Sequence, residues 1–320
     1  MDNKQIYKKT LGFSLRRLLW DVISLVLFLA LCTLGFMLGE KLIKNSVIGL
    51  VIGAIIGLAA VILISRFVSY MLKAGQIAMM TRGVTEGELP DSVIAEGKKV
   101  VKERFLTVAA YFAVTNVIKG IFNQIGRGIT KVGESIGGDT GGAIGGAVSS
   151  VMQTIVNYLC DCCLGWVFYR KDVKAAKATC EGAVLFFKHG KTLARNLGRV
   201  FGMGLVSLVA IGGVFSGIFY LVAAQFPAFF NELASIIATD AESSVALFLS
   251  DPTHLAIAAA VLGGVIVWSI IHGAFVRPFV LTGVLRNYLE SGMADVPSEA
   301  AFNMLDGKSK KFAELHAQVA

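Results

Sequence analysis

The sequence predicts an all-α, polytopic integral membrane protein with six transmembrane helices arranged as three hairpins. Hydrophobic residues make up 55% of the chain and charged residues only 16%, against roughly 25% charged residues in an ordinary soluble domain. Apolar runs such as 18–38, 47–64 and 200–224 reach the roughly 20 residues that a helix needs to cross a bilayer. The charged residues are concentrated between these runs, which favours a membrane protein over a soluble one.

The positions of the basic residues predict how these helices are oriented. The expected spans lie at 18–38, 47–68, 105–125, 143–167, 200–224 and 254–276. With a cytoplasmic N-terminus, the cytoplasmic segments hold 25 of the 30 Lys and Arg residues, whereas the outer loop 225–253 holds none. Cytoplasmic loops of membrane proteins carry an excess of Lys and Arg, so we expect both termini in the cytoplasm.

The spans divide the chain into three consecutive regions. They are 1–104 (first hairpin and a cytoplasmic amphipathic segment), 105–199 (middle hairpin, Gly-rich outer loop, basic inner loop) and 200–320 (third hairpin and cytoplasmic tail). Lys9-Thr10-Leu11 before the first span matches Lys191-Thr192-Leu193 before the fifth. A duplicated hairpin explains this match, and so does the general similarity of apolar helices flanked by Lys.

Glycine residues recur every fourth position around the fourth span. The two rows contain Gly133, Gly137, Gly141 and Gly145, and then Gly138, Gly142 and Gly146. On a helix such rows form a flat stripe that lets another backbone approach closely, as in a glycine zipper. The stripe can join subunits of a homo-oligomer or pack within one chain, and the first glycines can also belong to a flexible loop. Gly49, Gly53 and Gly57 form a shorter copy in the second span.

Polar residues inside the third and fourth spans are the candidates for a permeation path. Asn116, Lys119 and Asn123 share one helical face, and Gln153 and Asn157 share another. Such residues are costly in hydrocarbon and usually face the protein interior or water. The alternative is that Lys119 and Asn123 lie close enough to the outer surface to reach water. His272 is isolated in the sixth span, where a hydrogen-bonded interior histidine is the simpler expectation.

The inner loop after the fourth span is strongly basic. Its expected lipid-facing residues are Lys171, Lys174, Lys177, Lys188, Lys191 and Arg195. Basic residues near an anionic leaflet each contribute about 1 kcal/mol to lipid binding. We therefore expect membrane lipids, rather than nucleic acid, as the partner of this charge.

No catalytic motif accompanies these features. The sequence has no GxxxxGK[ST], GxSxG or HExxH pattern, and it contains only four histidines. Cys160, Cys162 and Cys163 lack the paired spacing of a structural zinc site. We expect neither an enzyme nor a bound metal or cofactor.

Two segments resemble a known family. The run from Asn157 to Trp166, with its cysteines, and the run from Ala183 to Asn196 are similar to the C-terminal part of the choline transporter-like family. The order of features agrees over about 105–290, whereas that family is longer and residues 1–104 do not match it. The resemblance implies transport of choline-like organic cations and supplies no binding residue.

Two functional hypotheses follow. The first is a permeation protein, a transporter or channel for a small solute such as choline, with its path between the third and fourth spans. The second is a structural or regulatory membrane scaffold that oligomerises through its glycines and binds anionic lipid through the inner loop.

Overall fold

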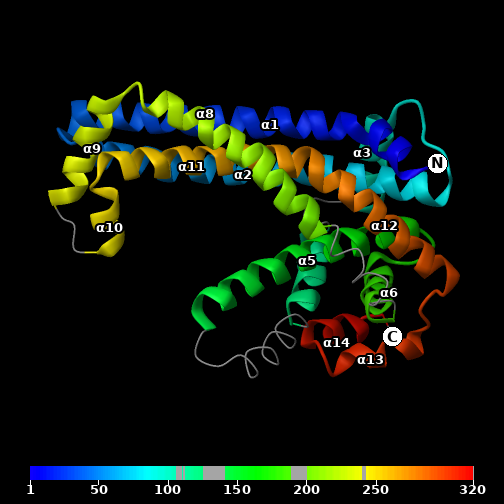
Figure 1. Ribbon diagram of the computed structural model, residues 1–320. Helices are drawn as coiled ribbons and strands as arrows, with labels where there is room; N and C mark the ends of the chain where they lie inside the picture. The colour runs from blue at the N-terminus through cyan, green and yellow to red at the C-terminus, as the bar shows by residue number, and fades with distance from the viewer. Residues whose placement is uncertain (106–109, 111, 125–140, 189–199, 240–242, 320) are drawn as a thin grey trace. The chain divides into compact units, whose positions relative to one another are not determined.

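The computed structural model describes residues 1–105, 110, 112–124, 141–188, 200–239 and 243–319, and every regular element among them is helical (Figure 1). The N-terminal elements are α1 (Asn3–Leu38), η1 (Gly39–Ile43), α2 (Ser46–Thr85), α3 (Val93–Arg104), a helix over 112–124, α5 (Gly141–Tyr169) and α6 (Ala175–Lys188). After a helix over 200–207 follow η3 (Leu208–Gly212), α8 (Gly213–Ala223), α9 (Pro227–Thr239), α10 (Ser244–Leu249), α11 (Pro252–Ile271), η4 (His272–Val276), α12 (Arg277–Ala294), η5 (Glu299–Ala301), α13 (Asn303–Asp306) and α14 (Lys310–His316). The all-α prediction is confirmed for this part of the chain.

The chain forms two compact units. The first consists of Met1–Leu197 and Pro278–Ala320, and the second of Gly198–Arg277. The two spans of the third expected hairpin thus make up the second unit, whereas the tail that follows them packs with the N-terminal part of the chain.

Three of the six expected spans are long and apolar enough to cross a membrane among the described residues. These helical stretches are Asn3–Leu42, Val200–Ala223 and Pro252–Ala294, and shorter apolar stretches cover Ile48–Ile64 and Pro227–Ala238. Helices of this length and composition are typical of membrane proteins.

The first hairpin consists of α1 and α2, which lie side by side (Figure 1). Its turn has Lys44 in the left-handed region (φ 54°), and the Asn45 side chain then accepts a hydrogen bond from the Ile48 amide at 3.1 Å. Away from the turn, both helices expose large apolar side chains, among them Met37, Ile55 and Leu63. A continuous apolar surface of this kind is typical of contact with lipid.

Glycines bring the two backbones of this hairpin into direct contact. A Cβ added at Gly49 would lie 2.2 Å from the carbonyl oxygen of Gly35 and 2.4 Å from the Cα of Gly39. A Cβ at Gly53 would lie 2.4 Å from the carbonyl oxygen of Leu31. The glycine row of the second span therefore packs within the chain, against α1.

The remainder of the first unit is a helical body made of residues 70–105, 112–124, 156–188 and 278–319. At its centre is the second half of α5, which is buried on every side from Tyr158 to Phe168. Close packing is visible at Gly292 of α12, where an added Cβ would lie 2.4 Å from the ring of Trp166. Tyr288 of the same helix donates a hydrogen bond to the carbonyl oxygen of Gly182 on α6.

The C-terminal segment, residues 295–319, covers one side of this body. Phe302 and Phe312 are fully buried together with Ile121 of helix 112–124 and Cys180 of α6. Gln124 accepts hydrogen bonds from the Ser309 hydroxyl at 2.6 Å and from the Lys311 amide at 3.2 Å. Ser309 in turn caps α14 by accepting from the Phe312 amide, so helix 112–124 and α14 are joined end to end.

The second unit is built on the contact between α8 and α11. The contact is closest at Gly264, where an added Cβ would lie 2.1 Å from the Ser216 hydroxyl and 2.6 Å from the Gly212 carbonyl oxygen. Asp251 caps the start of α11 by accepting from the amides of Thr253 and His254. The short helices α9 and α10 lie between the two long helices in the sequence.

Candidate functional site

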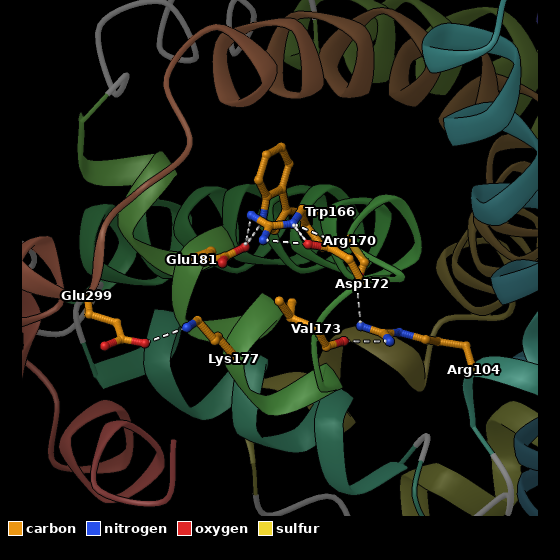
Figure 2. A network of polar contacts seen from close by, with 8 residues as sticks. All are labelled: Arg104, Trp166, Arg170, Asp172, Val173, Lys177, Glu181 and Glu299. Carbon is orange, nitrogen blue, oxygen red and sulfur yellow. Dashed lines mark hydrogen bonds and ion pairs between the residues drawn. The ribbon is translucent and has the colours of Figure 1, made fainter. Parts of the chain in front are cut away.

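A network of charged and polar side chains joins the end of α5 to the start of α6 (Figure 2). Its centre is Glu181, whose side chain is only 2% exposed. One carboxylate oxygen accepts hydrogen bonds from the Trp166 indole at 3.0 Å and from the Arg170 guanidinium at 2.9 Å. Burial raises the pKa of Glu181, and the hydrogen bond from Trp166 and the charge of Arg170 oppose this shift.

Arg170 also forms a two-pronged ion pair with Asp172. Its Nε and Nη2 atoms each lie 2.9 Å from an oxygen of that carboxylate. The hydrogen bond from Arg170 lowers the pKa of Asp172, which lies on the surface. Arg170 therefore connects a buried carboxylate to an exposed one across the turn between the two helices.

Arg104, the last residue of α3, closes the network from the opposite side. Its guanidinium donates to the carbonyl oxygens of Arg170 and Val173, both at 2.9 Å. Carbonyl groups just beyond a helix end have no partner within the helix, so this arginine satisfies them. The arrangement therefore pairs both carboxylates with arginine and fixes the α5–α6 turn.

A second charge pair, with a buried carboxylate, links α2 to α5. The Lys73 ammonium lies 2.5 Å from Asp161, whose side chain is 4% exposed. Nearby on α2, Gln76 donates to the Ser14 hydroxyl of α1 at 3.0 Å. Asp161 was not among the predicted site residues, although a lone acidic residue in an apolar helix is itself a signal for a buried partner.

The predicted path residues lie on helix 112–124 and on α5. These two helices contact each other through apolar side chains, namely Ile118, Phe122, Val156, Leu159, Cys160 and Cys163. Asn116, Lys119 and Gln153 are exposed, and Asn123 and Asn157 are half-buried. The proposed lining by these five residues stays a prediction.

The glycine rows can be located only in part. Gly133, Gly137 and Gly138 lie outside the described residues. The other four residues, Gly141, Gly142, Gly145 and Gly146, fall in the first turns of α5, but their surroundings also lie outside the described part. The close backbone packing predicted for the shorter row of the second span is seen at Gly49 and Gly53.

The basic inner loop separates into two kinds of lysine. Lys171 and Lys174 are exposed. Lys177 forms an ion pair with Glu299, and Lys188 forms one with Asp295, so both bind the C-terminal segment. Lys191 and Arg195 lie outside the described residues.

Part of the basic inner loop forms α6, and this helix packs inside the helical body. Its residues from Ala178 to Leu185 are buried. The three cysteines at the end of α5 and Cys180 of α6 are free thiols in the same core. Over the residues that the structure describes, no group of three His, Cys, Asp or Glu side chains is placed to hold a metal ion.

Comparison with known proteins adds no relative: no family model, no curated protein and no solved structure matches the chain. The resemblance to choline transporter-like proteins therefore remains an expectation from the quoted segments alone.

Proposed function

We propose that this protein is a membrane scaffold, in which apolar hairpins anchor a helical body at the cytoplasmic surface and exposed lysines of that body bind anionic lipid. The observation that carries the proposal is the contact of Gln124 and Ile121 with the C-terminal segment. In the six-span arrangement, residue 124 is at the outer end of the third span and the C-terminal segment is in the cytoplasm. Two such segments cannot be in direct contact.

The contact is explained if only four helices cross the membrane. The crossing stretches are then α1, the apolar part of α2, residues 200–223 and α11. Lys41 and Lys44 are the only basic residues left in outer loops, so 28 of the 30 Lys and Arg residues are cytoplasmic. An even number of crossings keeps both termini in the cytoplasm. The body then consists of residues that the six-span arrangement puts partly in the bilayer.

The charges of the body support lipid as its partner. Lys177 and Lys188 are neutralised by Glu299 and Asp295, whereas Lys171 and Lys174 are exposed and have no ion pair among the described residues. An unpaired ammonium group keeps its full attraction for an anionic headgroup.

Labelling of introduced cysteines tests the four-span topology. Lys119→Cys should react with a membrane-impermeant maleimide only from the cytoplasmic side, because Lys119 is exposed on the body. Lys41→Cys, in the turn of the first hairpin, should react only from the outer side and serves as the control. Protection of position 119 from both sides would favour six spans and remove the main support for the proposal.

Lipid retention tests the scaffold function. The double variant Lys171→Gln/Lys174→Gln should retain fewer anionic lipids in native mass measurements than the wild-type protein. The matched variant Lys177→Gln/Lys188→Gln removes the same charge from lysines that are already paired, and it should retain wild-type amounts. Equal losses in the two variants would show that retention depends on net charge and would contradict this assignment.

Permeation of a small solute is the second candidate. It is favoured by the polar face of helix 112–124, because exposed Asn116 and Lys119 would need water or a partner if that helix crosses the bilayer. A second copy joined through the glycine rows could supply that partner. Flux of choline or small ions into proteoliposomes, reduced by Asn116→Leu, would support this candidate. An assembly that disperses on Gly141→Leu/Gly145→Leu would support the oligomer.

A further inference from the structure

Ser207 is the centre of a half-buried polar cluster inside the apolar hairpin of the second unit. Its side chain is buried, and its hydroxyl oxygen makes three contacts of hydrogen-bond length. The hydroxyl donates to the Gly204 carbonyl oxygen at 2.9 Å, and the Trp268 indole N–H donates to the hydroxyl oxygen at 3.0 Å. Nδ1 of His272 completes the set at 2.9 Å.

Both helices change their geometry at this cluster. The π-helical turn η3 begins directly after Ser207, and the π-helical turn η4 begins at His272 itself. Single π-helical turns inside α-helices are uncommon and occur often at functional sites, because the extra residue redirects a side chain. Here two such turns on facing helices converge on one hydrogen-bonded pair.

The direction of the Ser207–Gly204 hydrogen bond decides which tautomer of His272 its 2.9 Å contact with Ser207 requires. Ser207 has one hydroxyl proton, and the bond to Gly204 uses it. The close contact with His272 is then a hydrogen bond only if Nδ1 carries the ring proton and donates it to the hydroxyl oxygen. The neutral ring therefore has a bare lone pair on Nε2, for which the described residues provide no partner.

We propose that Nε2 of His272 is a reversible proton-binding site within the membrane hairpin. Protonation forms one N–H bond at Nε2, gives the ring a charge of +1 and leaves the bonds to Gly204, Trp268 and Ser207 in place. The cluster can thus gain or lose a proton without rearranging. Ionisable residues inside spanning helices commonly carry a function.

Few charged or titratable groups lie on the same two helices as His272. The partial burial of His272 and the positive charge of Arg277 both act against a charge on the ring. Residues 200–223 contain no Asp, Glu, Lys or Arg, and Tyr220 is their only titratable side chain. On α11 the only other titratable residue is His254, which stacks on Phe248 at the start of the helix. Proton binding here goes beyond the scaffold function and does not depend on it.

Nitrogen NMR of the full chain in lipid nanodiscs tests the assignment directly. With histidine labelled at both ring nitrogens, the neutral form of His272 should show its proton on Nδ1 and an unprotonated Nε2. The His272→Gln variant identifies the signal among the four histidines. A neutral ring with its proton on Nε2 would overturn the proposal.

Tryptophan fluorescence tests reversible proton binding. The Trp268 and His272 rings lie 5.1 Å apart, and a protonated imidazole quenches a nearby indole more strongly than a neutral one. Acidification from about pH 8 to about pH 5 should reduce the emission of wild-type protein reversibly. The reduction should be smaller in His272→Gln and unchanged in His254→Gln, the matched histidine of the same hairpin.

The comparison with these variants is needed because Trp166 contacts Glu181 and can respond to pH as well. Identical titrations of wild-type protein and His272→Gln would contradict the proposal. A loss of the pH response in His254→Gln would show that His254 rather than His272 binds the proton, and it would also contradict the proposal.

Discussion

The ammonium group of Lys73 on α2 lies 2.5 Å from the carboxylate of Asp161 on α5, and the two side chains differ in their access to solvent. Asp161 is 4% exposed and Lys73 is 29% exposed. The pair joins the first hairpin to the most deeply buried helix of the body. Removing Lys73 should therefore destabilise the fold more than removing Asp161.

Lys73→Met should lower the free energy of unfolding by about 3–5 kcal/mol, because it takes this cation from a buried carboxylate. Asp161→Asn should cost less, since the lysine can reach water. The double variant should recover much of the loss in Lys73→Met. Thermal unfolding in detergent measures all three, and a larger loss in Asp161→Asn than in Lys73→Met would contradict the burial argument.

The glycine contact of the first hairpin should tolerate no side chain. Gly49→Ala places a Cβ 2.2 Å from a backbone oxygen that cannot move aside, so the hairpin must open. We expect a loss of about 1–3 kcal/mol in the free energy of unfolding. Gly217→Ala is the control, because nothing lies within 4 Å of its added Cβ. Equal free energies of unfolding for Gly49→Ala and Gly217→Ala would exclude the close backbone contact at Gly49.

Glu181 should make stability fall as pH rises. Its pKa is raised by burial, so between the ordinary glutamate value and the raised value the folded state holds a proton that the unfolded state has released. Stability in this window decreases with pH, and Glu181→Gln should remove that decrease. The measurement is thermal unfolding from about pH 5 to about pH 8.

Asp172→Asn is the control for this slope. The pKa of Asp172 is lowered by its hydrogen bond from Arg170, so its contribution is present above the ordinary aspartate value and is lost as pH falls through the lowered one. Its effect therefore lies below about pH 4 and has the opposite sign. A wild-type curve parallel to that of Glu181→Gln would show that Glu181 does not titrate in the expected range.

Cys180 should report whether the C-terminal segment is docked. Burial raises the pKa of its thiol to about 12, so the reactive thiolate is scarce and shielded at neutral pH. Gln124→Ala removes the acceptor that holds Ser309 and costs about 1 kcal/mol, which should speed labelling of Cys180 about fivefold. Glu314→Ala, on the exposed side of α14, should leave the rate unchanged. Equal rates in both variants would contradict docking through Gln124.

Local patterns predicted much of the secondary structure. The sequence predicts a helix over the second span, 47–68, and α2 covers this span and continues unbroken to Thr85. Hydropathy also identifies the apolar stretches of α1 and α11, because lipid contact requires a long apolar surface whatever the neighbouring helices are.

The site residues were harder to predict, because their partners are distant in the sequence. Nothing in the spacing of Lys177 and Lys188 indicates that Glu299 and Asp295 neutralise them. Likewise, the pattern of Ser207 and His272 gives no sign of their contact, since the two residues are 65 positions apart. Isolated polar residues in apolar helices were the available signal, and they do not name the partner.

The sequence by itself determined that this protein is helical, apolar and suited to a membrane, since these properties depend on composition and short-range periodicity. The tertiary structure decided which apolar segments face outward and which form the core of the helical body. The second half of α5 illustrates the difference, since Cys162 and Trp166 are fully buried among other helices. Hydropathy cannot separate these cases, because burial in lipid and burial in protein both remove an apolar side chain from water.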